Sequence, residues 1–451
     1  MPTKKKYQKI LIANRGEIAV RVLRTCKELG ISTVGVHSSV DETSLHVKLS
    51  DESVCIGPAK SSLSYLNIPN ILSATEITES DAIHPGFGFL SESYIFAEYC
   101  MKYNVDFIGP NIECIKKMGD KIRSKQIAQN AGLKVLTSVK VEGKNEQEIL
   151  KEVKCLGLPV LIKASAGGGG KGMERIDNIS KIMPTIKRLK KEAKDSFGDD
   201  TLFIEKYIQN PRHIEVQILA DKYGNVIHLG ERDCTIQKSY QKIIEESPCP
   251  IITNEIRNEL CSSAVKLAKY VNYDSVGTVE FLFDQDDREF YFMEMNTRIQ
   301  VEHPITEVLT GIDLIAEQIK ISQGEKLKIK QSDIKINGHA IECRINAGDP
   351  YKSIPSSGKI NYYYRPGGAG VRVDDFIYTG YTVLPFYDSM LSKVIAYSHT
   401  RDEAINKMKR ALDEIVIEGI STNKSLHQEI ISDDDFRGNN YSTNFLQNKI
   451  K

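Results

Sequence analysis

The start of the chain alternates apolar runs with an amphipathic stretch, and this pattern restricts the possible folds most. Lys9 to Ala13 predicts a buried strand, Glu17 to Leu29 predicts a helix that ends at Gly30, and Ile31 to Val36 predicts a second strand. A strand, helix and strand of this length require a right-handed crossover in a parallel sheet. The same alternation returns further on, with strand-like segments at 81–84 and 105–110 and a helix-like segment at 94–103. The N-terminal part therefore predicts an α/β domain.

The composition excludes several classes of protein. Of 451 residues, 41% are hydrophobic and 27% are charged, which is typical of a globular protein. Because 60 basic residues balance 60 acidic ones, nucleic acid is not expected as a partner. No stretch approaches the roughly 18–20 apolar residues of a membrane helix, so no membrane partner is expected. The nine cysteines include no Cys-x-x-Cys pair, and we expect free thiols in the cytoplasm.

The rest of the chain predicts a change of architecture. A polar helix is expected at about 112–130, and a strand at 158–163 leads directly into four glycines. From Leu202 the pattern is that of an antiparallel sheet. The expected strands are 202–207, 213–220, 225–230, 278–283 and 290–296. A helix at 313–322 follows, and the C-terminal part adds more strands and a charged helix at 401–415.

The glycine run from Gly167 to Gly170 is the most conspicuous local motif. A dinucleotide-binding loop needs a helix after the glycines, whereas Met173 to Ile176 predicts a strand. The run also lacks the Ser or Thr that ends a phosphate-binding Walker loop, because Gly172 stands there. We expect a glycine hairpin whose N–H groups cover phosphates as a mobile flap, with Lys163 nearby. A plain flexible surface loop is the alternative.

Two acids form a more specific pattern. The strand-like segments 279–283 and 290–296 flank a polar stretch and predict a hairpin. If its register is symmetric about Asp287, Glu280 and Glu294 lie opposite each other at about 5 Å. Two carboxylates at that distance repel by roughly 3 kcal/mol at an effective dielectric constant of ~20. A divalent cation such as Mg²⁺, which takes oxygen ligands, would offset this repulsion.

A line of polar residues continues from Glu294. If the strand continues, a period of two places Asn296, Arg298, Gln300 and Glu302 on the same face. A solvated sheet edge is the alternative interpretation. Upstream, His213 and Glu215 should face away from apolar Ile214 and Val216. The dense polar segment 231–242 predicts, taken alone, an exposed turn.

Taken together, these segments closely resemble biotin carboxylases, members of the ATP-grasp superfamily. The resemblance covers nearly the whole chain and rests on an ordered set of motifs. These are Ile12–Ala19, His84–Glu92, Lys163–Ser165 with its glycine loop, Glu294–Pro304 and Glu342–Ala347. It implies mixed α/β and α+β architecture. The expected parts are a Rossmann-like domain (1–113), an ATP-grasp domain (114–334) with a mobile lid at about 135–205, and an α+β domain (335–451).

The resemblance also implies roles for individual residues. ATP would be bound by Lys121, Lys163, Gly169, Gly170, Glu205, Lys206, Tyr207, Ile208, His213, Gln237, Tyr240, Glu280 and Glu294. Mg²⁺ or Mn²⁺ would be held by Glu280, Glu294 and Asn296. Bicarbonate would contact Lys242, Arg298, Gln300 and Val301. Glu302 would be the base that deprotonates bicarbonate, and Arg344 would stabilise the biotin enolate. Lys242, Arg298, Glu302 and Arg344 are thus the expected catalytic residues. Tyr240 departs from the family pattern, because several relatives have a nucleotide-contacting His there.

The implied reaction uses ATP to activate bicarbonate as carboxyphosphate and transfers CO2 to biotin. Because the chain shows no biotinyl or carboxyltransferase domain, we expect a separate biotin carboxyl carrier protein and separate carboxyltransferase subunits, together with a homodimer. The expected setting is acetyl-CoA carboxylase, which makes malonyl-CoA for fatty acid synthesis. The alternatives are a subunit of a pyruvate or other acyl-CoA carboxylase, a carboxylate–amine ligase of the ATP-grasp type, and a non-catalytic ATP-binding scaffold.

Overall fold

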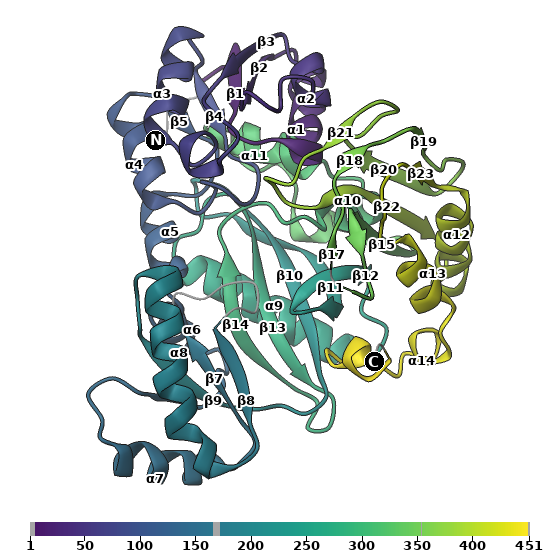
Figure 1. Ribbon diagram of the computed structural model, residues 1–451. Helices are drawn as coiled ribbons and strands as arrows, with labels where there is room; N and C mark the ends of the chain where they lie inside the picture. Colours follow the sequence, from purple (N-terminus) through teal and green to yellow (C-terminus); the bar gives the residue numbers. More distant parts are fainter. Residues whose placement is uncertain (1–4, 166–171, 353, 450–451) are drawn as a thin grey trace.

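The N-terminal region is a parallel α/β unit, as the alternating pattern predicts. The computed structural model describes residues 5–165, 172–352 and 354–449. Five parallel strands lie in the order β3-β2-β1-β4-β5 (Figure 1). The strands are β1 Lys9–Ile12, β2 Ser32–His37, β3 Glu52–Cys55, β4 Ala82–His84 and β5 Asp106–Phe107. The helices are α1 Gly16–Glu28, α2 Leu45–Leu49, α3 Ile68–Ile77 and α4 Tyr94–Lys102.

Helix α1 is buried along most of its length. Its apolar residues, Val22 and Leu23 among them, pack in a core shared with β1 and helix α11 (Leu314–Ser322). Two charged residues of α1 are also buried, because they pair with the C-terminal part of the chain. Glu17 lies 3.1 Å from the Nζ of Lys393, and Arg21 lies 2.8 Å from the carboxylate of Glu307. The first domain is thus joined to the rest by buried ion pairs as well as apolar contacts.

One antiparallel sheet of eight strands forms the body of the molecule. Its order is β14-β13-β10-β11-β12-β15-β22-β20. The strands are β10 Pro211–Ala220, β11 Val226–Lys238, β12 Gln241–Ser247, β13 Val276–Asp284, β14 Glu289–Asn296, β15 His339–Asn346, β20 Val371–Asp375 and β22 Met390–Ser398. The expected domain boundary at 334/335 falls just before β15, and the sheet continues across it because β12 pairs with β15.

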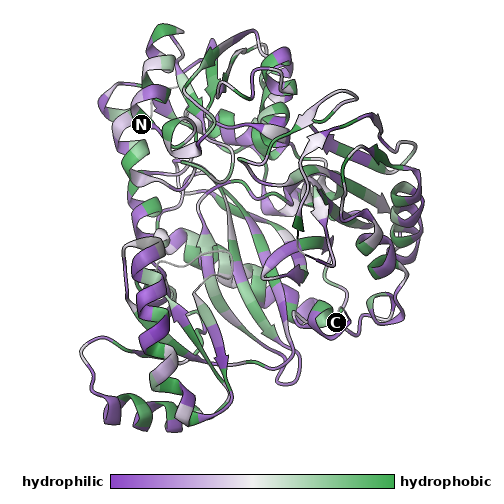
Figure 2. Ribbon diagram, in the orientation of Figure 1, coloured by the Kyte–Doolittle hydropathy of each residue, from purple (hydrophilic) through white to green (hydrophobic). Residues whose placement is uncertain are grey.

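The remaining helices of the body pack around this sheet, and apolar residues lie on both the helices and the strands (Figure 2). They are α5 Ile112–Gly119, α6 Lys121–Asn130, α9 Asn254–Tyr270, α10 His303–Thr310, α12 Arg401–Glu414, α13 Lys424–Ser432, α14 Asp434–Arg437 and α15 Phe445–Lys449. The single helix expected at 112–130 is two helices. The extended Asp120 separates them, and its side chain accepts hydrogen bonds from the N–H groups of Ile122 and Arg123.

A smaller four-stranded unit projects from the body between residues 138 and 206 (Figure 1). We call it the lid. Its strands lie in the order β6-β9-β7-β8. They are β6 Ser138–Lys140, β7 Val160–Ala164, β8 Met173–Ile176 and β9 Leu202–Lys206, with helices α7 Glu146–Leu156 and α8 Ile182–Phe197. The lid has a hydrophobic core of its own, formed by residues such as Val153, Ile162 and Leu189.

The prediction of an exposed turn at 231–242 is wrong. Strand β11 runs through Lys238, a two-residue turn follows, and β12 returns from Gln241. Glu231, Arg232 and Asp233 are buried because each has a charged partner: Arg257, Glu215 and Arg212 respectively. The pattern lacks apolar alternation because ion pairs rather than apolar contacts cover these side chains.

Candidate active site

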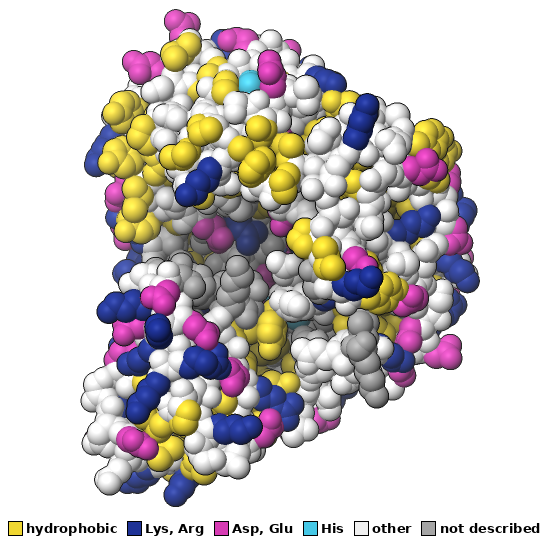
Figure 3. Space-filling model, in the orientation of Figure 1, with side chains coloured by type: hydrophobic (Ala, Val, Ile, Leu, Met, Phe, Trp, Pro, Cys, Tyr) yellow, Lys and Arg dark blue, Asp and Glu magenta, His cyan; other side chains and the backbone are white. Residues whose placement is uncertain are grey.

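A cavity of about 1030 Å³ opens between the lid and the eight-stranded sheet. Figure 3 shows the molecule hollowed at this place, with acidic and basic side chains visible inside. The cavity brings together nearly all of the residues proposed from the sequence. Its lining includes Lys121, Lys163, Glu205, Lys206, Tyr207, Ile208, His213, Gln237, Tyr240, Lys242, Glu280, Glu294, Asn296, Arg298, Gln300, Val301 and Arg344. Glu302 lies fully buried behind the wall, and Gly169 and Gly170 lie outside the described residues.

The acid pair forms as the hairpin pattern predicts, but its register is not symmetric about Asp287. Glu280 and Glu294 are direct partners on β13 and β14. Nearer the turn, Asp284 pairs with Glu289 and Phe281 with Phe292, so the ladder shifts by one residue at Met293. This β-bulge allows Glu294 to face Glu280 although the turn is one residue shorter than the symmetric register requires.

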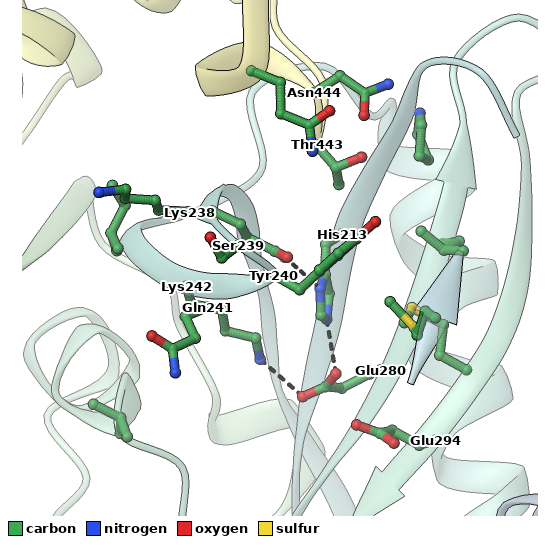
Figure 4. Close-up of a pocket in the computed structure, with 18 of the residues that line it drawn as sticks. His213, Lys238, Ser239, Tyr240, Gln241, Lys242, Glu280, Glu294, Thr443 and Asn444 are labelled. Carbon is green, nitrogen blue, oxygen red and sulfur yellow. Dashed lines mark hydrogen bonds and ion pairs between the residues drawn. The ribbon is translucent and has the colours of Figure 1, made fainter. Parts of the chain in front are cut away.

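Lys242 links three buried carboxylates at the centre of the site. Its Nζ donates to Glu215 at 2.6 Å, to Glu280 at 2.8 Å and to Glu302 at 2.9 Å. His213 reaches the other oxygen of Glu280 at 2.8 Å. Figure 4 shows Lys242 and His213 pointing toward Glu280, with Glu294 beside it. Burial lowers the pKa of Lys242, but the three acids outweigh burial and hold that pKa well above its usual value.

Glu302 is held between Lys242 and Arg344. Arg344 lies 2.9 Å from Glu302 and 2.5 Å from Glu245. Burial raises the pKa of Glu302, yet Lys242, Arg344 and Arg232 outweigh it and hold that pKa well below the usual range. The family resemblance, which places Glu302 beside Arg298 and Lys242, implies that these two cations lower its pKa. In the structure Lys242 does lower the pKa of Glu302, but the second main cation is Arg344 rather than Arg298.

The polar line after Glu294 converges on the site without the expected strand. Strand β14 ends at Asn296, and residues 297–302 form a turn that leads into α10. Asn296 and Gln300 donate to Glu280 at 2.7 Å and 3.3 Å. Arg298 donates to Asn296 at 3.0 Å and to Gln300 at 3.2 Å. A compact loop with mutual hydrogen bonds therefore gathers these side chains, rather than the alternation of a strand.

The lid contributes its charges from β7 and β9. Lys163 lies 2.7 Å from Glu205, and Lys125 of α6 pairs with the other oxygen of that carboxylate. Burial and the neighbouring Lys121 lower the pKa of Lys163 to about 8. β7 and β8 pair antiparallel on either side of the glycine run, as predicted. Lys121, Lys125 and Lys163 all line the cavity, so an anionic ligand bound there would neutralise their positive charge.

An aromatic and polar rim borders the cavity between the lid strand β8 and the β11–β12 turn. Tyr240 is 47% exposed at the β11–β12 turn, where Ser239 and Tyr240 have φ values of +49° and +64°. Gln237 contacts the Nδ1 of His213 at 2.8 Å. Arg175 lies over the ring of Tyr207 at 4.6 Å. These residues can accept a flat ring and a polar sugar between them.

Several residues that hold the site were not predicted from the sequence. They are Glu92, Lys125, Glu215 as a partner of Lys242, Glu245, and Lys393. Glu92 accepts from Arg298 at 2.9 Å, and Lys393 donates to the carbonyl of Val301 at 2.8 Å. For Glu215 a signal existed, because it shares a strand face with His213. The others are distant in sequence from the groups they contact, so no local pattern identified them.

The oxygen atoms of Glu280, Glu294 and the neighbouring Asn296 are suitable ligands for a divalent cation. Glu294 is partly buried, and burial together with the nearby Glu280 raises its pKa, so an added positive charge would be favourable there. Carboxylate and amide oxygens from Glu280, Glu294 and Asn296 are ligands that Mg²⁺ prefers. Such an ion would supply charge neutralisation between these acids and nucleotide phosphates.

Family models match most of the chain. They are "Biotin carboxylase, N-terminal domain" at residues 6–115, "Carbamoyl-phosphate synthase L chain, ATP binding domain" at 120–330, and "Biotin carboxylase C-terminal domain" at 342–448. Among the described residues, no helix has the length and apolar character needed to cross a membrane.

Individual relatives match end to end. Biotin carboxylase 1 of Bacillus subtilis is 51% identical over 98% of both chains. A pyruvate carboxylase subunit from Methanothermobacter thermautotrophicus is 49% identical, over 98% of this chain and 89% of its own. The biotin carboxylase domain of Hydrogenobacter thermophilus 2-oxoglutarate carboxylase is 45% identical with a TM-score of 0.94, covering 98% and 97%, and was solved as a dimer with MgADP, ADP and bicarbonate. With this fold and these matches, the chain belongs to the biotin carboxylase family of ATP-grasp enzymes.

Proposed function

We propose that the protein carboxylates biotin on a separate carrier protein, using ATP and bicarbonate through carboxyphosphate. The observation that carries this proposal is the cavity in which lysines, an acid pair and the Lys242–Glu302–Arg344 cluster meet. Lys121 and Lys163, with the Gly169 and Gly170 amides, bind phosphates. The adenosine part lies among Glu205, Lys206, Tyr207, Ile208, His213, Gln237 and Tyr240. Glu280, Glu294 and Asn296 hold Mg²⁺ or Mn²⁺.

The opposite end of the cavity binds bicarbonate. Lys242, Arg298, Gln300 and the backbone of Val301 contact it, and the guanidinium of Arg298 suits a planar anion. Glu302 takes the bicarbonate proton. Its lowered pKa makes it a weak base while Lys242 and Arg344 both contact it, so engagement of Lys242 with bicarbonate should restore part of its basicity. Arg344 then stabilises the negative charge that develops on biotin.

Within this family we propose acetyl-CoA carboxylase as the complex, which yields malonyl-CoA for fatty acid synthesis. This choice follows from the resemblance described above; the Bacillus subtilis relative, at 51% identity, is named only as a biotin carboxylase. Pyruvate carboxylase is the second candidate, because the archaeal relative is 49% identical. Partners in either case are a biotin carboxyl carrier protein and carboxyltransferase subunits. We also propose a homodimer, as in the Hydrogenobacter domain, and a cytoplasmic location, which the nine free cysteines support.

Release of ADP tests the reaction. We expect turnover that requires bicarbonate and rises when free biotin is added. Turnover that requires an amine instead of bicarbonate would replace this proposal with a carboxylate–amine ligase. Nucleotide binding without ADP release under either condition would indicate a non-catalytic scaffold. Identification of the biotinylated protein that co-purifies, and of the acyl acceptor its complex carboxylates, then separates acetyl-CoA from pyruvate carboxylase.

A further inference from the structure

Two buried acids that the proposed reaction does not use lie side by side behind Arg344. Glu245 on β12 and Glu342 on β15 are direct partners across the antiparallel ladder. Direct partners have Cβ atoms about 5 Å apart and side chains on the same face. Both residues are 0% exposed. Arg344 follows Glu342 by two positions, so it shares this face, and its guanidinium lies 2.5 Å from Glu245.

The neighbouring cations are too few to neutralise both acids. The titratable and charged groups around the pair are Lys242, Arg344, Lys393, Glu302, Cys234 and Cys343. Lys242 is already shared by three other carboxylates, and Lys393 pairs with Glu17. Arg344 also serves Glu302. Among the described residues, no hydrogen-bond donor reaches the oxygens of either acid, but Glu245 has the ion pair with Arg344 and Glu342 has none.

We propose that Glu245 and Glu342 share one proton and act together as a single negative counterion that positions Arg344. The proton stays on Glu342, and Glu245 carries the charge that faces the guanidinium. Both are positioning residues, since neither lines the cavity. This inference rests on the proposed role of Arg344 toward biotin.

The electrostatics agree with this geometry. Burial raises the pKa of Glu342 well above its ordinary value although Lys393 lowers it, whereas burial raises the pKa of Glu245 only to about 7 because Arg344 opposes the effect. With one charge from the pair and one from Glu302, Arg344 remains directed toward the cavity between two acceptors. If the shared proton were lost to solvent, a third negative charge would draw the guanidinium away from the cavity. Biotin carboxylation should therefore decline on the alkaline side when Glu342 ionises.

The test compares Glu342→Gln with the unaltered protein. An amide keeps the shape and the donor of a protonated carboxyl group but has no proton to lose. The measurement is kcat/KM for free biotin, from ADP release with bicarbonate, between about pH 6 and about pH 10. We expect the alkaline limb of this profile to move upward by about one pH unit or more in the variant. Glu245→Gln should instead lower kcat/KM for biotin by about tenfold or more across the range, because it removes the charge facing Arg344.

Glu246→Gln is the matched control. Glu246 neighbours Glu245 in sequence but contacts His339 and Arg401, each at 2.7 Å. Its loss should lower the thermal midpoint of unfolding without moving the alkaline limb. Infrared difference spectra should show a protonated carboxyl band at neutral pH that disappears in Glu342→Gln.

The proposal of a shared proton would be overturned if the alkaline limb did not shift in Glu342→Gln. It would also be overturned if the unaltered protein lacked that infrared band. So would an equal shift in the bicarbonate-dependent ADP release measured without biotin, because Arg344 would then not be the group affected. Absence of any biotin stimulation in the unaltered protein would refute the proposed function itself, which is a different result.

Discussion

The lid and the eight-stranded sheet face each other across the cavity, but they hold their charges differently. In the lid one carboxylate, Glu205, binds two lysines, and the lid core is separate from the core of the body. In the sheet, Lys242 binds three carboxylates and Arg344 two. Glu215, Glu280 and Glu302 each have a second partner, Arg232, His213 and Arg344 respectively, so each keeps one when Lys242 is exchanged for substrate.

This difference separates two tasks. The side proposed to receive bicarbonate and biotin is preorganised, so little rearrangement is needed when charge develops there. We expect the side proposed to receive phosphates to exchange the ion pair of Lys163 for a ligand and to move as a unit, because its apolar core is its own. Removing a sheet charge should therefore affect chemistry and stability together, whereas removing a lid charge should affect nucleotide binding alone.

Of the variants described here, Lys242→Met should lose the most stability and the most activity. Three buried carboxylates lose a shared cation, and removing one partner from a buried ion cluster costs about 3–5 kcal/mol of the free energy of unfolding. We expect bicarbonate-dependent ADP release to fall by about 10³-fold or more, as expected for loss of a bound charge in the site. Denaturant unfolding and ADP release measure both effects. Lys222→Met is the control, since that lysine donates to the carbonyl of Ser322, outside the site. Similar losses in both variants would refute the central role of Lys242.

Arg344→Ala should separate the biotin-dependent activity from the bicarbonate-dependent hydrolysis of ATP. Biotin-dependent ADP release should fall by about 10²–10³-fold, because the charge on biotin loses its stabilising partner. Slow bicarbonate-dependent ATP hydrolysis should remain, since Lys242 still holds Glu302. Steady-state assays with and without biotin distinguish these outcomes. Equal loss of both activities would contradict a specific role toward biotin.

Lys163→Met should show the contrasting behaviour of the lid. The KM for ATP should rise by about 10–100-fold, because a cation that contacts phosphate is lost. The free energy of unfolding should fall less than in Lys242→Met, since Lys125 still pairs with Glu205 and one carboxylate rather than three loses a cation. A loss of stability as large as that of Lys242→Met would show that the two regions do not differ as described.

Acid should destabilise the sheet more than the lid. His339 and Arg401 outweigh burial and hold the pKa of Glu246 well below its usual value. The unfolded chain therefore binds the proton more readily, and this stabilisation is present above about pH 4.5 and lost as the pH falls further. We expect a loss of about 1–3 kcal/mol, smaller in Glu246→Gln. Hydrogen exchange should show earlier opening of β12 than of β7; the reverse order would contradict the comparison.

Periodicity predicted the parts of the fold that apolar residues build. The strands β1 and β2, the helix α1 and the hairpin of β13 and β14 follow from local patterns. The turn at 231–242 was wrong because Arg232 and Asp233 are buried by partners that lie elsewhere in the sequence. Local patterning cannot show a strand whose burial depends on distant ion pairs.

The candidate site shows the same limit. Opposed strands predicted the pairing of Glu280 with Glu294, since cross-strand geometry follows from the hairpin. The gathering of Arg298 and Gln300 was expected for a reason that is wrong, because a turn rather than a strand brings them in. The resemblance to a family named the residues, but only the fold shows that Arg344 and Lys242 hold Glu302.

The buried Lys393 has a consequence for chimeric enzymes. It pairs with Glu17 in the first helix and donates to the backbone of Val301 in the site. A recombinant in which the N-terminal domain came from a homologue without an acid at position 17 would leave this ammonium group buried without its counterion. Such a hybrid would carry its defect in the turn formed by residues 297–302, far along the chain from the junction at which it was assembled.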